Sequence, residues 1–249
     1  MWGYSKRLRF VREAIAAAFP KRPGPSLRVL DVGCGNGSQL ALPLAIGGDL
    51  KLTGIDPDNS SIERARRFAG ERANIKFRLG QIEDLFDQRP FDVVILSEVL
   101  EHLERPAEML SAGVRLMDSN GILIVTVPNG YGEFEIDSWI FSSFRLQKVV
   151  NALARKREVL GATDNQASGH VQFFTRARLG RLFDAAGLVV LREGTGSLLA
   201  GPIVGHLVRQ WPRFFEWNAR ITNHLPFGFA SGWYFVLGLR RARTIGDSI

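Results

Sequence analysis

Short apolar runs alternate with helical patterns along this chain, and this alternation constrains the fold more than any other feature. The apolar runs predict strands at Arg28–Val32, Lys51–Ile55, Ile75–Arg78, Phe91–Leu96 and Gly121–Val127. The spacing between them predicts amphipathic helices at Gly37–Ile46, Ser60–Ala69 and Pro106–Met117. Such alternation is typical of an α/β fold in which helices cover both faces of a parallel sheet. In these sheets, ligands bind beyond the carboxyl ends of the strands.

Two longer segments interrupt the alternation, at about residues 129–169 and 194–232. The pattern resumes between and after them, with a helix at Arg176–Ala186 and strands at Leu188–Arg192 and Trp233–Arg240. We therefore predict a single domain over residues 1–249. Its core covers about residues 26–128, 170–193 and 233–241, and the two interruptions are insertions of the kind that form a lid.

Bulk composition excludes several classes of protein. The only cysteine, Cys34, rules out an intramolecular disulfide, and no apolar stretch approaches the ~20 residues that span a bilayer. Residues 1–19 are interrupted by charges and do not read as a signal peptide, so we expect a cytoplasmic protein. The net charge of +7 fits an anionic partner and equally fits ordinary solubility.

A glycine-rich turn, VLDVGCGNG, follows the first predicted strand. Gly33, Gly35 and Gly37 let the backbone turn sharply and approach a ligand closely. The spacing is not the G-x-G-x-x-G of dinucleotide-binding proteins. Asp31 on the strand would repel a pyrophosphate but would suit a ligand with an ammonium group.

A second acid, Asp56, ends the next predicted strand in the stretch TGIDPD. A carboxylate at this place can accept hydrogen bonds from both ribose hydroxyls. The two acids together favour a nucleoside with a cationic tail and no phosphate. S-adenosylmethionine is such a ligand.

With these motifs in place, the sequence resembles the class I S-adenosylmethionine-dependent methyltransferases. The blocks VLDVGCGNG, GIDPD, IKFRLGQIEDL, FDVVILSEVLEHL and GILIVTVPN occur in the family's order, over about residues 28–130. The O-methyltransferases of ubiquinone biosynthesis are the most similar branch in motif. The resemblance implies a Rossmann-like, mostly parallel sheet of seven strands whose last strand is antiparallel.

The resemblance also implies roles for particular residues in binding S-adenosylmethionine. The methionine moiety would contact Asp31, Gly33, Cys34, Gly35 and Gly37 at the end of the first strand and in the turn. The ribose would contact Asp56 and Pro57 after the second strand. Adenine would contact Gln81 and Ile82 after the third strand, and the sulfonium would lie beside Leu96 of the fourth.

The stretch ILSEVLEHL places three proton carriers, Glu98, Glu101 and His102, after the fourth predicted strand. On a helix, these positions would share one face. His102, with Glu101, could act as a base that accepts the proton of an acceptor hydroxyl, since an imidazole titrates near neutrality. This stretch also resembles a second branch of the family, the small-RNA 2′-O-methyltransferases. That resemblance implies that Glu98, Glu101, His102 and His170 could instead hold Mg²⁺, Mn²⁺ or Zn²⁺. The sequence leaves both mechanisms open, together with a purely structural role in which His102 only caps the turn after the strand.

The methyl acceptor is constrained mainly by what the chain lacks. Enzymes of this class that methylate ring or exocyclic amines often carry N/D-P-P-Y where this chain has LSEV. We therefore expect O-methylation of a small or lipid-linked acceptor, such as a quinone precursor or a glycolipid sugar, and no nucleic-acid partner. The alternatives are a methyltransferase acting on RNA or another polymer, and a non-catalytic interaction module.

The two insertions combine aromatic and basic residues. Such a mixture can roof an acceptor pocket, and it can also hold a protein at an anionic membrane surface. The residues concerned are Trp139, Trp211, Phe214 and Phe215 with Arg145, Lys148, Arg209 and Arg213. Both interpretations remain open, and the sequence does not indicate an oligomeric state.

Overall fold

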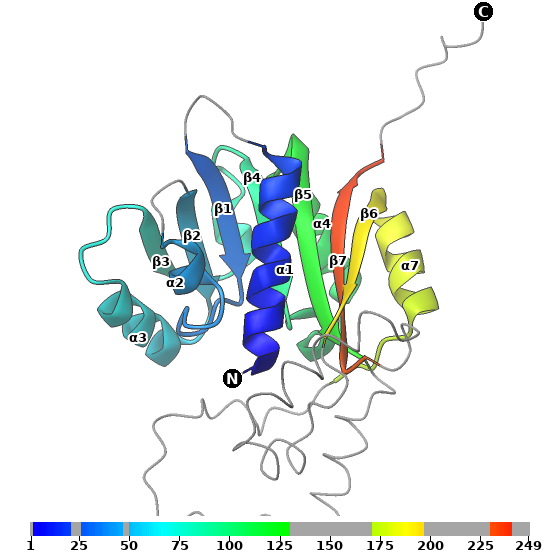
Figure 1. Ribbon diagram of the computed structural model, residues 1–249, viewed down its shortest axis with the longest axis horizontal. Coiled ribbons are helices and arrows are strands. Elements are labelled where there is room, and N and C mark those ends of the chain that lie inside the picture. Colours follow the sequence, from blue (N-terminus) through cyan, green and yellow to red (C-terminus); the bar gives the residue numbers. More distant parts are fainter. Residues whose placement is uncertain (1, 21–25, 47–49, 130–170, 197–229, 241–249) are drawn as a thin grey trace, which may run out of the picture.

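A single seven-stranded sheet, with the strand order β3-β2-β1-β4-β5-β7-β6, forms the centre of the molecule (Figure 1). The computed structural model describes residues 2–20, 26–46, 50–129, 171–196 and 230–240. The strands are β1 (Leu27–Val32), β2 (Leu50–Asp56), β3 (Ile75–Leu79), β4 (Phe91–Ser97), β5 (Met117–Pro128), β6 (Leu188–Thr195) and β7 (Gly232–Leu239). All seven predicted strands are present, with small differences at their ends.

The sheet is parallel from β3 through β5, and β7 runs antiparallel to both of its neighbours, β5 and β6. This arrangement confirms the predicted Rossmann-like class with its antiparallel last strand. β6 continues to Thr195, beyond the predicted end at Arg192, because its last residues pair with Trp233–Phe235 of β7.

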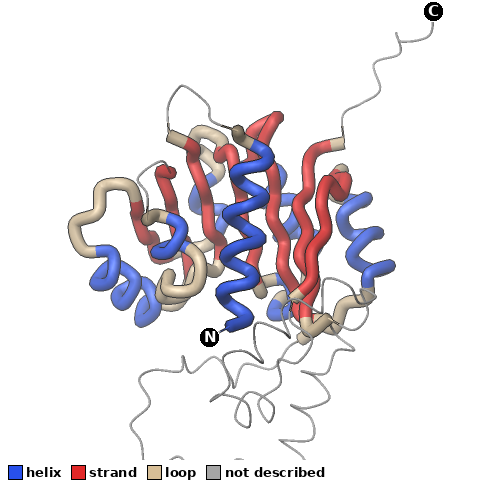
Figure 2. Tube along the Cα trace, viewed as in Figure 1, coloured by secondary structure: helices blue, strands red, loops and turns tan. Residues whose placement is uncertain are grey.

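Helices cover both faces of the sheet (Figure 2). They are α1 (Trp2–Ala18), α2 (Ala41–Leu44), α3 (Asn59–Ala69), α4 (Pro106–Leu116) and α7 (Arg176–Ala185), with two 3₁₀ turns, η1 (Ile82–Leu85) and η2 (Leu100–His102). Residues of α1, α2 and α3 join one buried apolar cluster, and those of α4 and α7 join the other. Within β4, Val93 and Ile95 belong to the first cluster, while Val94 and Leu96 belong to the second. A strand that is buried on both faces has a continuous apolar sequence, because successive side chains pack on opposite sides of the sheet. This burial explains why the apolar runs predicted the strands so well.

The helix predicted at Gly37–Ile46 is wrong in length, because only Ala41–Leu44 is helical. Gly37 has a φ of +74°, which a right-handed helix cannot include, and a Cβ there would lie 2.6 Å from Cζ of Phe77. Pro43 also lacks the N–H that would bond back to residue 39. The chain after β1 therefore passes through turns before it forms one short helical turn.

Both predicted insertions lie almost wholly outside the described residues, which resume at 171 and 230. Among the helices that are described, none is long and apolar enough to cross a membrane.

Candidate active site

The glycine-rich turn after β1 is fixed by backbone contacts to β2. The N–H groups of Gly33 and Cys34 both donate to the carbonyl of Ile55, at 2.9 and 3.2 Å. Gly33 has a φ of +66°, and a Cβ on it would lie 2.8 Å from Cγ2 of Val99. Glycine is therefore required at this position for both conformation and space, and the turn presents bare backbone at the carboxyl edge of the sheet.

Asp56, the last residue of β2, organises the same edge. One carboxylate oxygen accepts the N–H of Gly35 at 2.8 Å, and the other accepts the N–H of Asp58 at 2.9 Å. An ionised carboxylate offers about four acceptor positions, so two remain for a ligand. The predicted ribose-binding acid is thus held in place by the turn next to it.

Asp31 lies beside them at the end of β1 and is almost fully buried, with 3% of its surface exposed. Burial raises the pKa of Asp31 from its ordinary 3.8 to about 7; the positive charge of Arg7 opposes this rise, and the negative charge of Asp56 adds to it. A buried acid of this kind gains strongly from a cationic ligand, because the ligand compensates its lost solvation. Its environment fits the ammonium-bearing ligand that the sequence predicted.

The raised pKa of Asp31 predicts a pH-dependent stability for the ligand-free protein. Because the folded state binds this proton more tightly, ionising Asp31 costs stability as the pH rises from about 4 to 7, and the cost is constant above that. We expect Asp31→Asn to raise the free energy of unfolding at pH 8 by up to ~4 kcal/mol and to change it little near pH 4. Urea unfolding at both pH values measures this, and an equal effect at both would contradict it.

The predicted adenine-binding residues lie on the next loop along the edge. The N–H of Gly80 donates to the carbonyl of Asp56 at 3.1 Å, and the N–H of Gln81 donates to Asp84 at 2.8 Å. The side chain of Gln81 is exposed, while that of Ile82 is buried in η1. Gln81 therefore lies on the same edge as Asp56, with its side chain accessible to a ligand.

Two of the predicted cofactor residues are packed rather than open. Leu96 is fully buried in the core cluster on the α4 side of the sheet. Burial is also the main cause that raises the pKa of the Cys34 thiol, so this thiol stays protonated. Cys34 is therefore suited to packing rather than to acting as a nucleophile.

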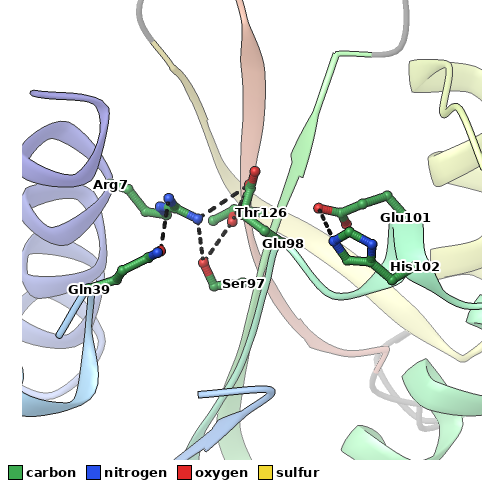
Figure 3. Close-up of polar contacts among 7 residues, drawn as sticks. All are labelled: Arg7, Gln39, Ser97, Glu98, Glu101, His102 and Thr126. Carbon is green, nitrogen blue, oxygen red and sulfur yellow. Dashed lines mark hydrogen bonds and ion pairs between the residues drawn. The ribbon is translucent and has the colours of Figure 1, made fainter. Parts of the chain in front are cut away.

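Arg7 of α1 is a part of the site that the sequence interpretation missed. It is 8% exposed, and it donates to Oγ of Ser97 at 3.0 Å and to Oε1 of Gln39 at 3.4 Å. It also lies 3.5 Å from Oε1 of Glu98, so it connects α1 to the end of β4 (Figure 3). The first helix is thus part of the site and not only a cover for the sheet.

A signal for Arg7 is present in the sequence. Arg7 lies on one helical stripe with Phe10, Val11 and Ala14, at i+3, i+4 and i+7, and all three are buried. A charged residue on the apolar stripe of an amphipathic helix must meet a partner inside the fold. Lys6 beside it is also buried, and its Nζ donates to the carbonyl of Gly196 at 2.9 Å.

The expectation that Glu98, Glu101 and His102 share one helical face is wrong. Glu98 precedes the turn and has a φ of +56°, and only Leu100–His102 is helical, as one 3₁₀ turn. The Glu98 carboxylate accepts from Oγ1 of Thr126 at 2.9 Å and faces Arg7. Glu101 and His102 lie apart from it as a pair, with Oε1 and Nε2 separated by 3.9 Å (Figure 3).

The Glu101–His102 pair combines a buried acid with an accessible imidazole. Glu101 is 1% exposed, whereas the His102 side chain is 37% exposed. His170 lies outside the described residues. Within the described part of the chain, no three His, Cys, Asp or Glu side chains come together in a group that could hold a metal ion.

Comparison with known proteins places the chain in a family. A family model described as a methyltransferase domain matches residues 3–193, and the chain belongs to this methyltransferase-domain family. Among curated proteins, a ubiquinone biosynthesis O-methyltransferase of Maricaulis maris is 37% identical over 129 residues. The match covers 49% of this chain and 50% of that relative, so the chain is matched over about half the length of such relatives. The resemblance seen in the motifs is thereby confirmed.

Solved structures confirm the fold. A magnesium protoporphyrin IX methyltransferase from Synechocystis, solved with bound S-adenosylhomocysteine, has a TM-score of 0.55 and 18% identity, covering 95% of this chain and 84% of its own. The [4+2]-cyclase SpnF has a TM-score of 0.57 and 18% identity, covering 96% and 82%. Since these two proteins differ in the reaction that they catalyse, the fold does not define the chemistry, which must be argued from the site.

Proposed function

We propose that this protein binds S-adenosylmethionine at the carboxyl edge of β1, β2 and β4 and transfers its methyl group. The observation that carries this proposal is the position of two acids, Asp31 and Asp56, beside the same glycine-rich turn. Asp56 has acceptor positions for the ribose hydroxyls, and buried Asp31 favours a cationic tail. Solved relatives with bound S-adenosylhomocysteine or S-adenosylmethionine support the same assignment.

We propose a small aromatic compound with a hydroxyl group, such as a quinone precursor, as the methyl acceptor. Similar curated proteins are O-methyltransferases of ubiquinone biosynthesis, which supports this class. His102 accepts the hydroxyl proton, the oxygen attacks the methyl carbon, and the bond from carbon to sulfur breaks to leave S-adenosylhomocysteine. Glu101, at 3.9 Å, stabilises the imidazolium that this step creates.

Incubation with a catechol probe, 3,4-dihydroxybenzoate, and deuteromethyl S-adenosylmethionine tests the proposal. We expect mass spectrometry to show a labelled methyl ether that depends on the protein. Binding of the cofactor without transfer to the probe would exclude this acceptor class. It would leave a polymer acceptor or a non-catalytic role to be tested.

A metal-free mechanism agrees best with the placement of the acidic residues. Glu98, one of the four predicted metal ligands, is bound to Arg7 and Thr126 and does not join the Glu101–His102 pair. We expect turnover of the catechol probe to persist after dialysis against a chelator. Loss of turnover that Mg²⁺ or Mn²⁺ restores would contradict this expectation and would assign a metal to Glu101 and His102.

We also propose that the insertions bring the protein to an anionic lipid surface, which is one of the two roles that their aromatic and basic composition allows. Each basic residue near such a surface contributes about 1 kcal/mol, and salt screens this attraction. Flotation with anionic vesicles at low salt is expected to recover the protein, whereas neutral vesicles or high salt should not. No flotation with either vesicle type would favour the lid interpretation and a freely soluble acceptor.

A further inference from the structure

The turn that carries His102 is held by a segment about 70 residues further along the chain. Nε2 of Gln172 donates to the carbonyls of Leu103 and Glu104, both at 2.7 Å. The backbone N–H groups of Val171 and Gln172 both donate to the carbonyl of Glu101, at 3.0 and 3.1 Å. Four hydrogen bonds from two adjacent residues therefore fall on the carbonyls directly around His102.

These bonds matter because η2 can stabilise itself only weakly. It contains three residues, and its internal bonds run from the N–H of His102 to Val99 at 3.1 Å and from Leu103 to Leu100 at 3.3 Å. The last carbonyls of a helical turn have no partner within the turn, and 3₁₀ bonds have poor geometry. The position of His102 therefore depends on the partners that Val171 and Gln172 provide.

The amide of Gln172 is itself fixed by α7. The Arg178 guanidinium donates to Oε1 of Gln172 and, at 3.1 Å, to the carbonyl of Phe173. It also lies over the ring of Phe174, which is buried, with 5.2 Å from Cζ to the ring centroid. Because a guanidinium only donates, it holds the amide oxygen toward itself and directs the NH₂ group at the two carbonyls.

We propose that Gln172 is a positioning residue for His102, with Arg178 as its support. It holds the η2 turn so that the imidazole keeps the orientation needed to accept the acceptor's proton. This inference rests on the proposed function, because it assumes that His102 is the base. In the stretch GHVQFFT, the sequence interpretation used only His170, whereas this inference concerns Gln172.

Gln172→Glu is the most selective test. The substitution keeps the size of the side chain and an acceptor for Arg178, but it replaces the two donated bonds with an oxygen facing two carbonyls. We expect the amides of His102 and Leu103 to exchange their hydrogens at least ~10-fold faster. Turnover of the catechol probe should fall ~10–100-fold, because small misplacements of a catalytic group have effects of this size. The dissociation constant for S-adenosylhomocysteine should stay within about 2-fold.

Gln88→Glu, at an exposed glutamine after η1, is the matched control and should change none of these values. Exchange in β4 should also be unchanged, which separates a local effect from general destabilisation. Unchanged exchange at His102 and Leu103 would overturn the inference. A lower melting temperature with normal turnover would also overturn it, since the role would then be structural only.

His102→Ala, measured alongside, distinguishes failure of this inference from failure of the proposed function. Full turnover in His102→Ala rejects His102 as the base. Impaired turnover in His102→Ala with normal exchange and turnover in Gln172→Glu rejects only the positioning role. The exchange measurement requires no methyl acceptor, so it tests whether Gln172 holds the η2 turn even if the probe is not methylated.

Discussion

Replacing Asp56 by alanine is expected to weaken S-adenosylmethionine binding by about 100-fold or more. The ribose would lose two charge-assisted hydrogen bonds to the Asp56 carboxylate, each contributing roughly 1.5–3 kcal/mol. The substitution also removes the acceptor of the Gly35 and Asp58 N–H groups, so the glycine-rich turn loses its anchor to β2. Calorimetric titration of both proteins with S-adenosylmethionine measures the change.

Asp58→Ala provides a matched control two residues away. Asp58 caps α3 through bonds to the N–H groups of Ser60 and Ser61, at 3.2 and 3.0 Å, and its side chain is exposed. Loss of this cap should lower the stability of the protein slightly and leave the affinity unchanged. An affinity of Asp56→Ala equal to that of the wild type would show that Asp56 does not hold the ribose.

The second large effect is expected at His102. His102→Ala should lower turnover of the catechol probe by about 10²–10⁴-fold, the usual contribution of a general base. Its affinity for S-adenosylhomocysteine should stay the same, because the proposed function places the histidine at the acceptor and the cofactor at the glycine-rich turn. Steady-state kinetics with calorimetry separates the two quantities.

Arg105→Ala is the control for His102, since Arg105 is close in sequence and its side chain is 76% exposed. It should behave as the wild type. A His102→Ala variant with equally normal turnover would remove the imidazole from the mechanism. If its turnover fell only through weaker cofactor binding, His102 would belong to the cofactor site instead.

The fold could be predicted closely because its central strands are buried on both faces. Such strands appear as continuous apolar runs, and Val93–Leu96 shows how successive residues serve opposite clusters. The error at Gly37–Ile46 arose where a positive φ and Pro43 override an apolar pattern that is compatible with a helix. Apolar periodicity therefore identified buried strands well and turns poorly.

The position of a candidate site residue could be predicted only where it follows from the end of a strand. Asp31, Asp56 and the glycines are of this kind. The separation of Glu98 from Glu101 and His102 depends on one backbone conformation and on Arg7, which arrives from a helix 90 residues earlier in the chain than Ser97. The hydrogen bonds from Gln172 to the η2 turn likewise join segments that are distant in sequence. Contacts of this kind are set by packing: a local pattern can mark a buried charge, as the apolar stripe does for Arg7, but it does not identify the partner.

A crystal structure of the wild-type protein grown with millimolar S-adenosylhomocysteine tests the central claim most directly. We predict the ribose hydroxyls at the Asp56 carboxylate and the methionine end along Gly33–Gly35 near Asp31. The sulfur should face the side of the edge where His102 lies. Absence of the ligand at this concentration would contradict the account. A ligand bound elsewhere, or with its adenine toward His102, would contradict it equally.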